Sequence, residues 1–315
     1  MALSANELAD LNRSEIPAQT VTNTSIGYVL SKCINTNQPF VVPRWTTLNE
    51  NYKILAEESL GQKASRDFEL KYFGVGVRGS NCVGQDSRGV SQMQVNQHQP
   101  IDANLFTPVP FIARPLTEDL DSFNRAKYRM RTVEERNGEL YAFYWLKLID
   151  FAKYNPHEVE IEHDPITGEE KTNPYIHTED NLKNPQPVPL TSEGTVPISN
   201  LYVNGSAILD CTLYQADLRE MSLACKIYYN DASYASVNEL GVAYGIDVEH
   251  RGAIAGNGTI QYTEVASAIF AHYITERDGR NALTNTQLNN ALDHGASAPM
   301  LLHTVANSSA QGQGN

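Results

Sequence analysis

The 315-residue sequence has few basic residues, only two tryptophans and no long apolar run. Its 24 Lys and Arg are outnumbered by 37 Asp and Glu, which gives a formal net charge of −13. Nucleic-acid binding needs clustered Lys and Arg, so this balance argues against a nucleic-acid partner and against docking on an anionic membrane. No stretch approaches the ~18 consecutive apolar residues of a transmembrane helix.

A secretion signal and a paired-cysteine motif are also missing. Residues 1–14 are polar and lack the apolar centre of a signal peptide. No CxxC pair and no histidine at metal-ligand spacing accompanies the four cysteines, Cys33, Cys82, Cys211 and Cys225. Three of them lie in apolar or β-like surroundings, so we expect free, buried thiols in a soluble protein made in a reducing cytoplasm.

Catalytic motifs are absent from the sequence. It contains neither a GxSxG elbow nor a phosphate-binding GxxxxGK[ST] loop. Residues 74–79 match GxGxxG, but the next residues, SNCVGQDSRG, are typical of turns, whereas a dinucleotide site needs a helix N-terminus there. We interpret these glycines as loop glycines and predict no catalytic, cofactor-binding or metal-binding residues.

The HEVEIEH run at residues 157–163 combines histidines with acidic residues, as metal sites do. On a strand, His157 and His163 would share one face with the two apolar residues, and the three glutamates would lie on the other. The zincin pattern requires two histidines one helical turn apart, and these are six residues apart on a β pattern. We therefore predict an acidic, exposed hairpin with a turn at DPITG.

Tyrosine is the abundant aromatic residue, with 16 Tyr against 9 Phe and 2 Trp. A Tyr ring buries apolar area while its hydroxyl keeps a polar partner, so the surplus fits broad, partly wet contacts between subunits. The tyrosine surplus fits a β-rich fold with half-exposed strands equally well.

Trp45 and Trp145 lie in apolar contexts, and we expect both in the core.

The apolar patterns predict an α+β fold that is rich in β-structure, with mixed antiparallel sheets or a sandwich and several short helices. Asn137-Gly138 is the strongest two-residue hairpin signal in the chain. Three prolines in the segment 106–115 predict an extended edge segment. Strands are expected at 67–77, 129–135, 139–149, 206–213 and 237–246.

Helices are expected where apolar residues recur with a period of about 3.6 residues. The clearest spans 217–229, with Asp217 as N-cap and Glu220 in the capping-box position. A second spans 262–275 and places Tyr262, Val265, Ile269 and Tyr273 on one face. Shorter helices are expected at 48–60 and at 117–128, the latter capped by Thr117.

Shifts in composition divide the chain into five parts. We predict an N-terminal arm with a small helical or extended segment, a β-rich N-terminal domain, an acidic and proline-rich flap or insertion, a C-terminal α+β domain and a flexible tail. Their respective bounds are 1–66, 67–152, 153–195, 196–305 and 306–315. Polar termini of this kind are typical of subunits whose arms order only against neighbours.

Two sets of segments carry a resemblance to a known class of proteins. One set runs from LYVNGSAILDC to GVAYGID and continues with GTIQYTEVASAIFAHYIT; the other is FELKYFGVGVRGS with FTPVPFIARP and NGELYAFYWLKLID. Over roughly residues 67–150 and 200–280, they resemble virion structural proteins of large phages with contractile tails, of the baseplate-wedge or neck-and-collar type. The tryptophan-proline pair expected after the first strand of a wedge protein is missing, which argues for the neck or collar.

This resemblance implies a non-enzymatic subunit that assembles in several copies around the tail axis. Its expected location is the virion, assembled in the host cytoplasm. The expected partners are copies of the same chain and other tail proteins, with no cofactor, no nucleic acid and no membrane. No catalytic residues carry over.

Two alternatives remain open. Exposed Tyr and Trp with Asn, Gln and Asp would suit a receptor- or carbohydrate-binding module of the same particle. A tail-associated hydrolase would require a carboxylate pair about 5–9.5 Å apart in a cleft. The candidates for that pair are Asp247 and Glu249, near the glycine-rich turn expected at 252–258.

Overall fold

A computed structural model describes residues 19–54, 61–85, 87–151, 156–164, 166–179, 187–188, 198–254, 258–281, 287–288 and 291–301. These residues divide into two compact units, a larger one within Met1–Ile149 and Cys211–Asn290 and a smaller one within Asp150–Asp210 and Ala291–Asn315. Antiparallel sheets with a few short helices make up the described parts. The predicted β-rich α+β fold is therefore confirmed.

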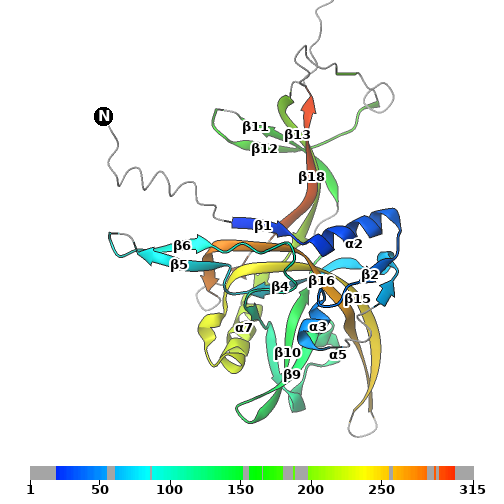
Figure 1. The fold of residues 1–315 in the computed structure, drawn as a ribbon, viewed down its shortest axis with the longest axis vertical. Coiled ribbons are helices and arrows are strands. Elements are labelled where there is room, and N and C mark those ends of the chain that lie inside the picture. The colour runs from blue at the N-terminus through cyan, green and yellow to red at the C-terminus, as the bar shows by residue number, and fades with distance from the viewer. Residues whose placement is uncertain are drawn as a thin grey trace, which may run out of the picture. The chain divides into compact units, whose positions relative to one another are not determined.

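An eight-stranded sheet forms the centre of the larger unit. Six strands follow the order β1-β16-β15-β4-β10-β8, while β7 pairs with β4 and β9 pairs with β10. The bounds are β1 Gln19–Asn23, β4 Glu69–Gly76, β7 Pro108–Val109, β8 Ile112–Pro115, β9 Tyr128–Arg136, β10 Glu139–Leu148, β15 Ser236–Ile254 and β16 Gly258–Asn281. The long strands β15 and β16 run side by side through this unit (Figure 1).

Short helices and two-stranded sheets surround the large sheet. The α-helices are α2 Ser25–Thr36, α3 Leu48–Tyr52, α5 Ser122–Arg125 and α7 Gln215–Tyr228, and the 3-10 turns are Ser65–Asp67, Leu116–Glu118 and Ala232–Tyr234. The small sheets pair β2 Phe40–Val42 with β3 Gly61–Lys63, β5 Ser80–Gln85 with β6 Ser91–Val95, and β14 Leu213–Tyr214 with β17 Gln287–Leu288. Among the described residues, no helix has the length and apolar character needed to cross a lipid bilayer.

Two apolar clusters form the core of the larger unit. One contains Phe270 with Leu48, Phe143 and Trp145, and the other contains Ile269 with Leu30 of α2. Alternate side chains of a strand point to opposite faces, so the adjacent residues Ile269 and Phe270 place these clusters on opposite faces of the sheet. The central strands are therefore covered on both sides.

Two glycines permit the close packing of β15. A Cβ atom on Gly241 would collide with the Phe270 ring, and one on Gly245 would collide with the Tyr72 ring. The interruption of the predicted strand 237–246 by these glycines is thus a packing requirement. The strand itself is confirmed and extends to Ile254.

The predicted helix at 262–275 is wrong, because these residues lie in β16. Tyr262, Val265, Ile269 and Tyr273 do recur with helical spacing. However, residues 264–271 are all buried, since both faces of β16 are covered. A strand buried on both faces shows no alternation, and a run of small and apolar residues then matches either period.

The helix predicted at 217–229 is confirmed, but its N-terminal cap differs. The N-cap is Tyr214, whose backbone N–H donates to the Asp217 carboxylate at 3.0 Å. The chain pairs as β14 up to Tyr214, so the helix begins directly after that strand. Glu220 does not cap the helix; it forms an ion pair with Arg114 at 2.7 Å.

The predicted helix 117–128 is reduced to two single turns. Thr117 lies within the 3-10 turn, and Asp121 caps α5 by accepting from the Asn124 N–H at 2.8 Å. Between the turns, Asp119 is extended and its carboxylate binds Arg131 at 2.7 Å. This ion pair draws the chain away from a continuous helix.

Several local predictions agree with the structure. The hairpin β9–β10 turns at Asn137 and Gly138, which have φ of 54° and 82°. The proline-rich segment 106–115 supplies β8 at one end of the sheet order. The helix predicted at 48–60 is confirmed for Leu48–Tyr52, and residues 55–60 lie outside the described residues.

The smaller unit contains one four-stranded sheet. Its order is β12-β11-β13-β18, with bounds β11 His157–His163, β12 Glu170–Pro174, β13 Ile198–Asp210 and β18 Ala291–Leu301. The acidic hairpin predicted with a DPITG turn is β11–β12, and Gly168 in its turn has φ of 74°. It is one half of this sheet and not a separate flap.

The predicted domain boundaries need correction. Domains at 67–152 and 196–305 would separate β4 from β15, yet these strands pair directly within one sheet. Long-range strand pairing leaves no mark in local composition, which explains the error. Residues 1–18 of the predicted arm, the predicted tail 306–315, and residues 255–257 of the predicted glycine-rich turn lie outside the described residues.

Candidate functional site

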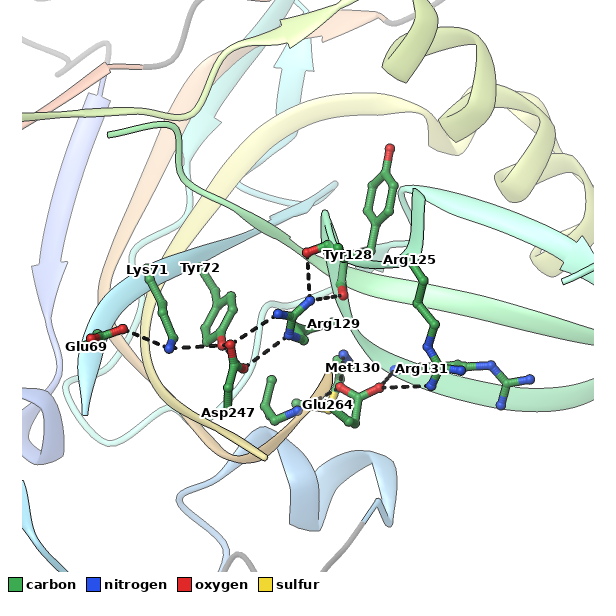
Figure 2. Close-up of polar contacts among 12 residues, drawn as sticks. Glu69, Lys71, Tyr72, Arg125, Tyr128, Arg129, Met130, Arg131, Asp247 and Glu264 are labelled. Atoms are coloured by element: carbon green, nitrogen blue, oxygen red, sulfur yellow. Dashed lines mark hydrogen bonds and ion pairs between the residues drawn. The ribbon is translucent and has the colours of Figure 1, made fainter. Parts of the chain in front are cut away.

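Asp247 on β15, one of the two carboxylates considered for hydrolysis, is held by basic and phenolic side chains. Its Oδ1 and Oδ2 accept from Arg129 Nε and Nη2, both at 3.1 Å, and Oδ1 also accepts from the Tyr72 hydroxyl (Figure 2). Lys71 Nζ lies 3.4 Å from Oδ2. Both carboxylate oxygens therefore have donors from the protein itself.

These contacts determine the ionisation of Asp247. Burial by itself raises the pKa of this carboxyl, but the hydrogen bonds from Arg129 and Tyr72 and the nearby positive charges bring it below its ordinary value. A glycosidase acid has a raised pKa and holds a proton for the leaving group. Glu249 is exposed and accepts from Gln261 Nε2 at 2.8 Å. The environment of Asp247 thus favours a structural ion pair over a general acid.

A second carboxylate, that of Glu264 on β16, is buried and binds the backbone at the start of β9. It accepts from the backbone N–H groups of Met130 at 2.9 Å and Arg131 at 3.4 Å, and Arg125 Nη2 lies 3.8 Å away (Figure 2). Met130 has φ of 58°, so the backbone here is left-handed in a residue other than glycine. The carboxylate stabilises this conformation by satisfying both N–H groups.

His98 lies at the centre of a third polar cluster. Its side chain is fully buried, with Nδ1 2.8 Å from Asp102 Oδ2 and Nε2 2.6 Å from Glu239 Oε1. The imidazole is stacked between the rings of Phe106 and Tyr273, each with its centroid 3.9 Å away. Each ring nitrogen of His98 therefore has one carboxylate oxygen within hydrogen-bond distance.

This cluster joins a loop to the sheet. Asp102 and Phe106 lie in the loop that follows β6, whereas Glu239 and Tyr273 lie in β15 and β16. The sequence did not single out His98, although two signals were present. Asp102 lies four residues after it, and Glu239 directly precedes the apolar run LGVAYGI.

Many of the tyrosine side chains are buried within the larger unit. Tyr72, Tyr144 and Tyr273 are among its largest fully buried side chains. The Tyr144 hydroxyl donates to Asp119 at 2.8 Å, and burial followed by this carboxylate raises the pKa of Tyr144. A phenol that stays protonated can donate to a buried acceptor, so these rings fill the core and also satisfy carboxylates.

The tryptophans and cysteines only partly follow the predictions. Trp145 is 4% exposed and confirmed as a core residue, whereas the prediction for Trp45 is wrong: it is 64% exposed, with Arg44 stacked on its ring. All four cysteines are free thiols. Cys211 and Cys225 are buried, and burial raises the pKa of Cys225 to about 12, but Cys33 is half-buried and Cys82 is exposed.

The sheet of the smaller unit exposes apolar side chains. The register pairs Ile161 with Tyr202 and Val159 with Asn204, which places these four residues on one face. Val159, Ile161 and Tyr202 remain only half-buried. Within the part of this unit whose side chains the structure describes, Leu209 is the sole buried hydrophobic residue.

Strand β11 carries His157 and His163, the two histidines that were considered as metal ligands. His163 Nδ1 lies 3.8 Å from Glu170 Oε1. A third histidine, His177, follows β12, and its ring contacts Glu158. In the described segments, no three His, Cys, Asp or Glu side chains come together as a metal site would require. The predicted acidic, exposed hairpin thus describes β11–β12 well.

Comparison with known proteins gives one match. A family model described as "Family of unknown function (DUF7208)" matches residues 10–309. No curated protein matches the chain, and no solved structure does. Because the matched region covers well over half of the sequence, the chain belongs to DUF7208, a family of unknown function.

Proposed function

We propose that this protein is a non-enzymatic structural subunit of a tailed-phage virion, at the baseplate wedge or at the neck or collar, present in several copies. The observation that carries this proposal is the four-stranded sheet of the smaller unit. Apolar side chains on a sheet are stabilised when another element covers them. Val159, Ile161 and Tyr202 lie together on one face, beside polar residues such as Asn204 and Thr172, and remain half-exposed there, which supports a role in contact with other subunits.

The polar groups of the larger unit support the same proposal. Asp247, Glu264 and His98 face partners from other strands and loops of this unit. Their hydrogen bonds hold distant segments together, and their donors and acceptors are directed at the protein itself. Such networks favour a rigid scaffold over a site prepared for a substrate.

The proposal is tested on tailed particles purified from the source by density gradient. Quantitative mass spectrometry should find this chain in the particle fraction, in several copies for each particle. Cross-links should join the smaller unit to other virion proteins, with residues 157–174 and 198–210 among the linked segments. Particles that lack the chain would contradict the proposal.

A second candidate is a receptor- or carbohydrate-binding module of the same particle, which the exposed Trp45 ring favours. An indole that is 64% exposed and flanked by Arg44 is suited to stacking on a sugar ring. Binding to a glycan array that disappears in Trp45→Ala would support this candidate. Phe123→Ala is the matched control, because Phe123 is also exposed, at 76%, and is stacked with Lys127.

A further inference from the structure

In the two large sheets, six described strands pair with one neighbour only: β1, β7, β8, β9, β12 and β18. They differ in how they are protected against pairing with another chain. Natural edge strands are blunted by charge, by proline or by an element packed over them. β8 contains Arg114 and Pro115, and α7 packs against it through the ion pair of Arg114 with Glu220. That edge is therefore closed to a further strand.

The outer strands of the smaller sheet are blunted as well. β12 has the sequence EKTNP, with exposed Glu170 and Lys171, and it ends in Pro174. β18 includes Pro299, which has no N–H to donate to a neighbouring strand. β7, β8, β12 and β18 thus include a proline. β9 has none, but it carries charged side chains, and the Glu264 carboxylate accepts from its Met130 N–H.

β1 is the exception. Its sequence, QTVTN, contains no charge, no proline and no glycine, and its three central residues are β-branched. It pairs with β16 on one side. Among the described residues, no backbone hydrogen bond reaches β1 from the other side. The part of the chain that the structure describes therefore leaves the outward N–H and C=O groups of this strand to a new partner.

The sequence of β1 is suited to pairing with itself. In an antiparallel pair centred on Val21, Val21 lies opposite the partner's Val21, Thr20 opposite the partner's Thr22, and Gln19 opposite the partner's Asn23. Every pair is chemically compatible, because no like charges meet and the amide side chains face each other. Val21 is 53% exposed, so this pairing covers an apolar side chain.

We propose that two copies of this chain associate through antiparallel pairing of their β1 strands, which joins their eight-stranded sheets into one. The contact is isologous, as expected for a two-fold axis. The pairing follows from β1 alone, and it rests on the proposed function only for its setting in a particle. It supplies a contact between copies, which a subunit present in several copies requires.

The test begins with the mass of the purified full-length chain, measured by light scattering over a range of concentrations. The wild-type protein should have the mass of two chains. Val21→Lys places two positive charges opposite each other at the edge, so its association should be weaker by at least about tenfold. Val41→Lys is the matched control, since Val41 is 64% exposed on β2, outside β1, and this variant should keep the two-chain mass.

Cross-linking tests the register and does not depend on whether Val21→Lys folds. Cys82→Ser removes the exposed native thiol. In this background, Val21→Cys treated with a mild two-electron oxidant should form a disulfide between two copies, because opposed Cβ atoms lie ~4.5–5.5 Å apart. Val41→Cys in the same background should not. A monomeric wild-type protein, a two-chain mass that Val21→Lys leaves unchanged, or equal cross-linking of the two cysteine variants would each overturn the proposal.

The outcome is separable from that of the particle experiment. A monomer that is nevertheless found in virions would overturn β1 self-pairing and leave the proposed function intact. A dimer that depends on Val21 but is absent from particles would support β1 self-pairing and overturn the proposed function. A Val21→Cys cross-link to a different virion protein would also overturn self-pairing, and would identify that protein as the donor of the added strand.

Discussion

At the scale of single residues, the larger unit depends on buried and half-buried carboxylates that bind donors from distant segments. Asp247 binds Arg129, Tyr72 and Lys71, and Glu264 binds the backbone at Met130. A buried charge is costly unless it is paired and hydrogen-bonded. Removal of one side chain therefore leaves the remaining charged or polar groups without a partner, and this makes the stability of the protein sensitive to substitution in each network.

Asp247→Asn tests the network around this carboxylate. The change leaves Arg129 with a neutral partner, so the free energy of unfolding at neutral pH should fall by about 2–3 kcal/mol. Chemical denaturation of both proteins measures this difference. Glu249→Gln is the control on the same strand; its side chain is exposed, and the change should stay within about 0.5 kcal/mol.

The same variant has a defined dependence on pH. The pKa of Asp247 is lower in the folded protein than its ordinary value of about 3.9, so its stabilising contribution is complete above that value. The contribution is lost as the pH falls through the lower pKa of the folded state. The gap between wild type and Asp247→Asn should therefore be largest near neutral pH and should narrow below about pH 4. A gap that widens in acid would contradict the assigned role.

At the scale of elements, β15 depends on the absence of side chains where neighbouring rings approach it. Gly241→Ala would place a Cβ atom against the Phe270 ring in a strand that is covered on both faces. Overpacking of this kind costs about 1–3 kcal/mol, so the melting temperature should fall. Gly84→Ala on β5 is the matched control, since no heavy atom lies within 4 Å of its added Cβ. Equal melting temperatures for the two variants would show that β15 and Phe270 can move apart.

Elements whose signal is local were predictable from the sequence. The Asn137-Gly138 turn requires left-handed backbone at two adjacent residues, and few other dipeptides adopt it. α7 has one covered face, so its apolar period stays visible. The helix expected at 262–275 failed for the opposite reason: β16 is buried on both faces, and its run ASAIFA shows neither period clearly.

Features that depend on pairing across the chain were not predictable. The contact between β4 and β15 joins residues more than 160 positions apart, and the sequence of neither segment indicates that the other is its pairing partner. The same applies to His98 and Glu239, which meet across 141 positions. Local composition instead placed a domain boundary between segments that share one sheet.

At the scale of the whole molecule, the two units differ in how completely they bury their own apolar residues. The larger unit has core clusters on both faces of its sheet. In the described part of the smaller unit, apolar side chains such as Ile161 and Tyr202 stay half-exposed, and Ile166 and Ile176 are 92% and 78% exposed. Local stability follows buried apolar contact, so the smaller unit should open more readily in the isolated chain.

Hydrogen exchange followed by mass spectrometry measures this difference. Amides of β11 and β12 should exchange well before those of β4, β10 and β15 in the purified protein. Under the proposed function, the same amides should become protected in assembled particles, because a partner would cover the sheet there. Equal protection of both units in the isolated chain would mean that the smaller unit completes its own core, and it would remove the main support for a subunit contact there.

A pair of tyrosine substitutions separates a ring in a subunit-contact surface from a ring in the core. Tyr202→Ala removes a half-exposed ring from the smaller unit. It should change the free energy of unfolding of the isolated chain by no more than about 0.5 kcal/mol. Under the proposed function, it should also weaken incorporation of the chain into particles. Tyr144→Ala removes a fully buried ring and its bond to Asp119, and should cost about 3–5 kcal/mol. If Tyr202→Ala destabilises the isolated chain as strongly as Tyr144→Ala, that ring belongs to a core and not to a contact surface. The comparison distinguishes a sheet whose apolar side chains are buried only by a partner from one whose apolar side chains are buried within the isolated chain.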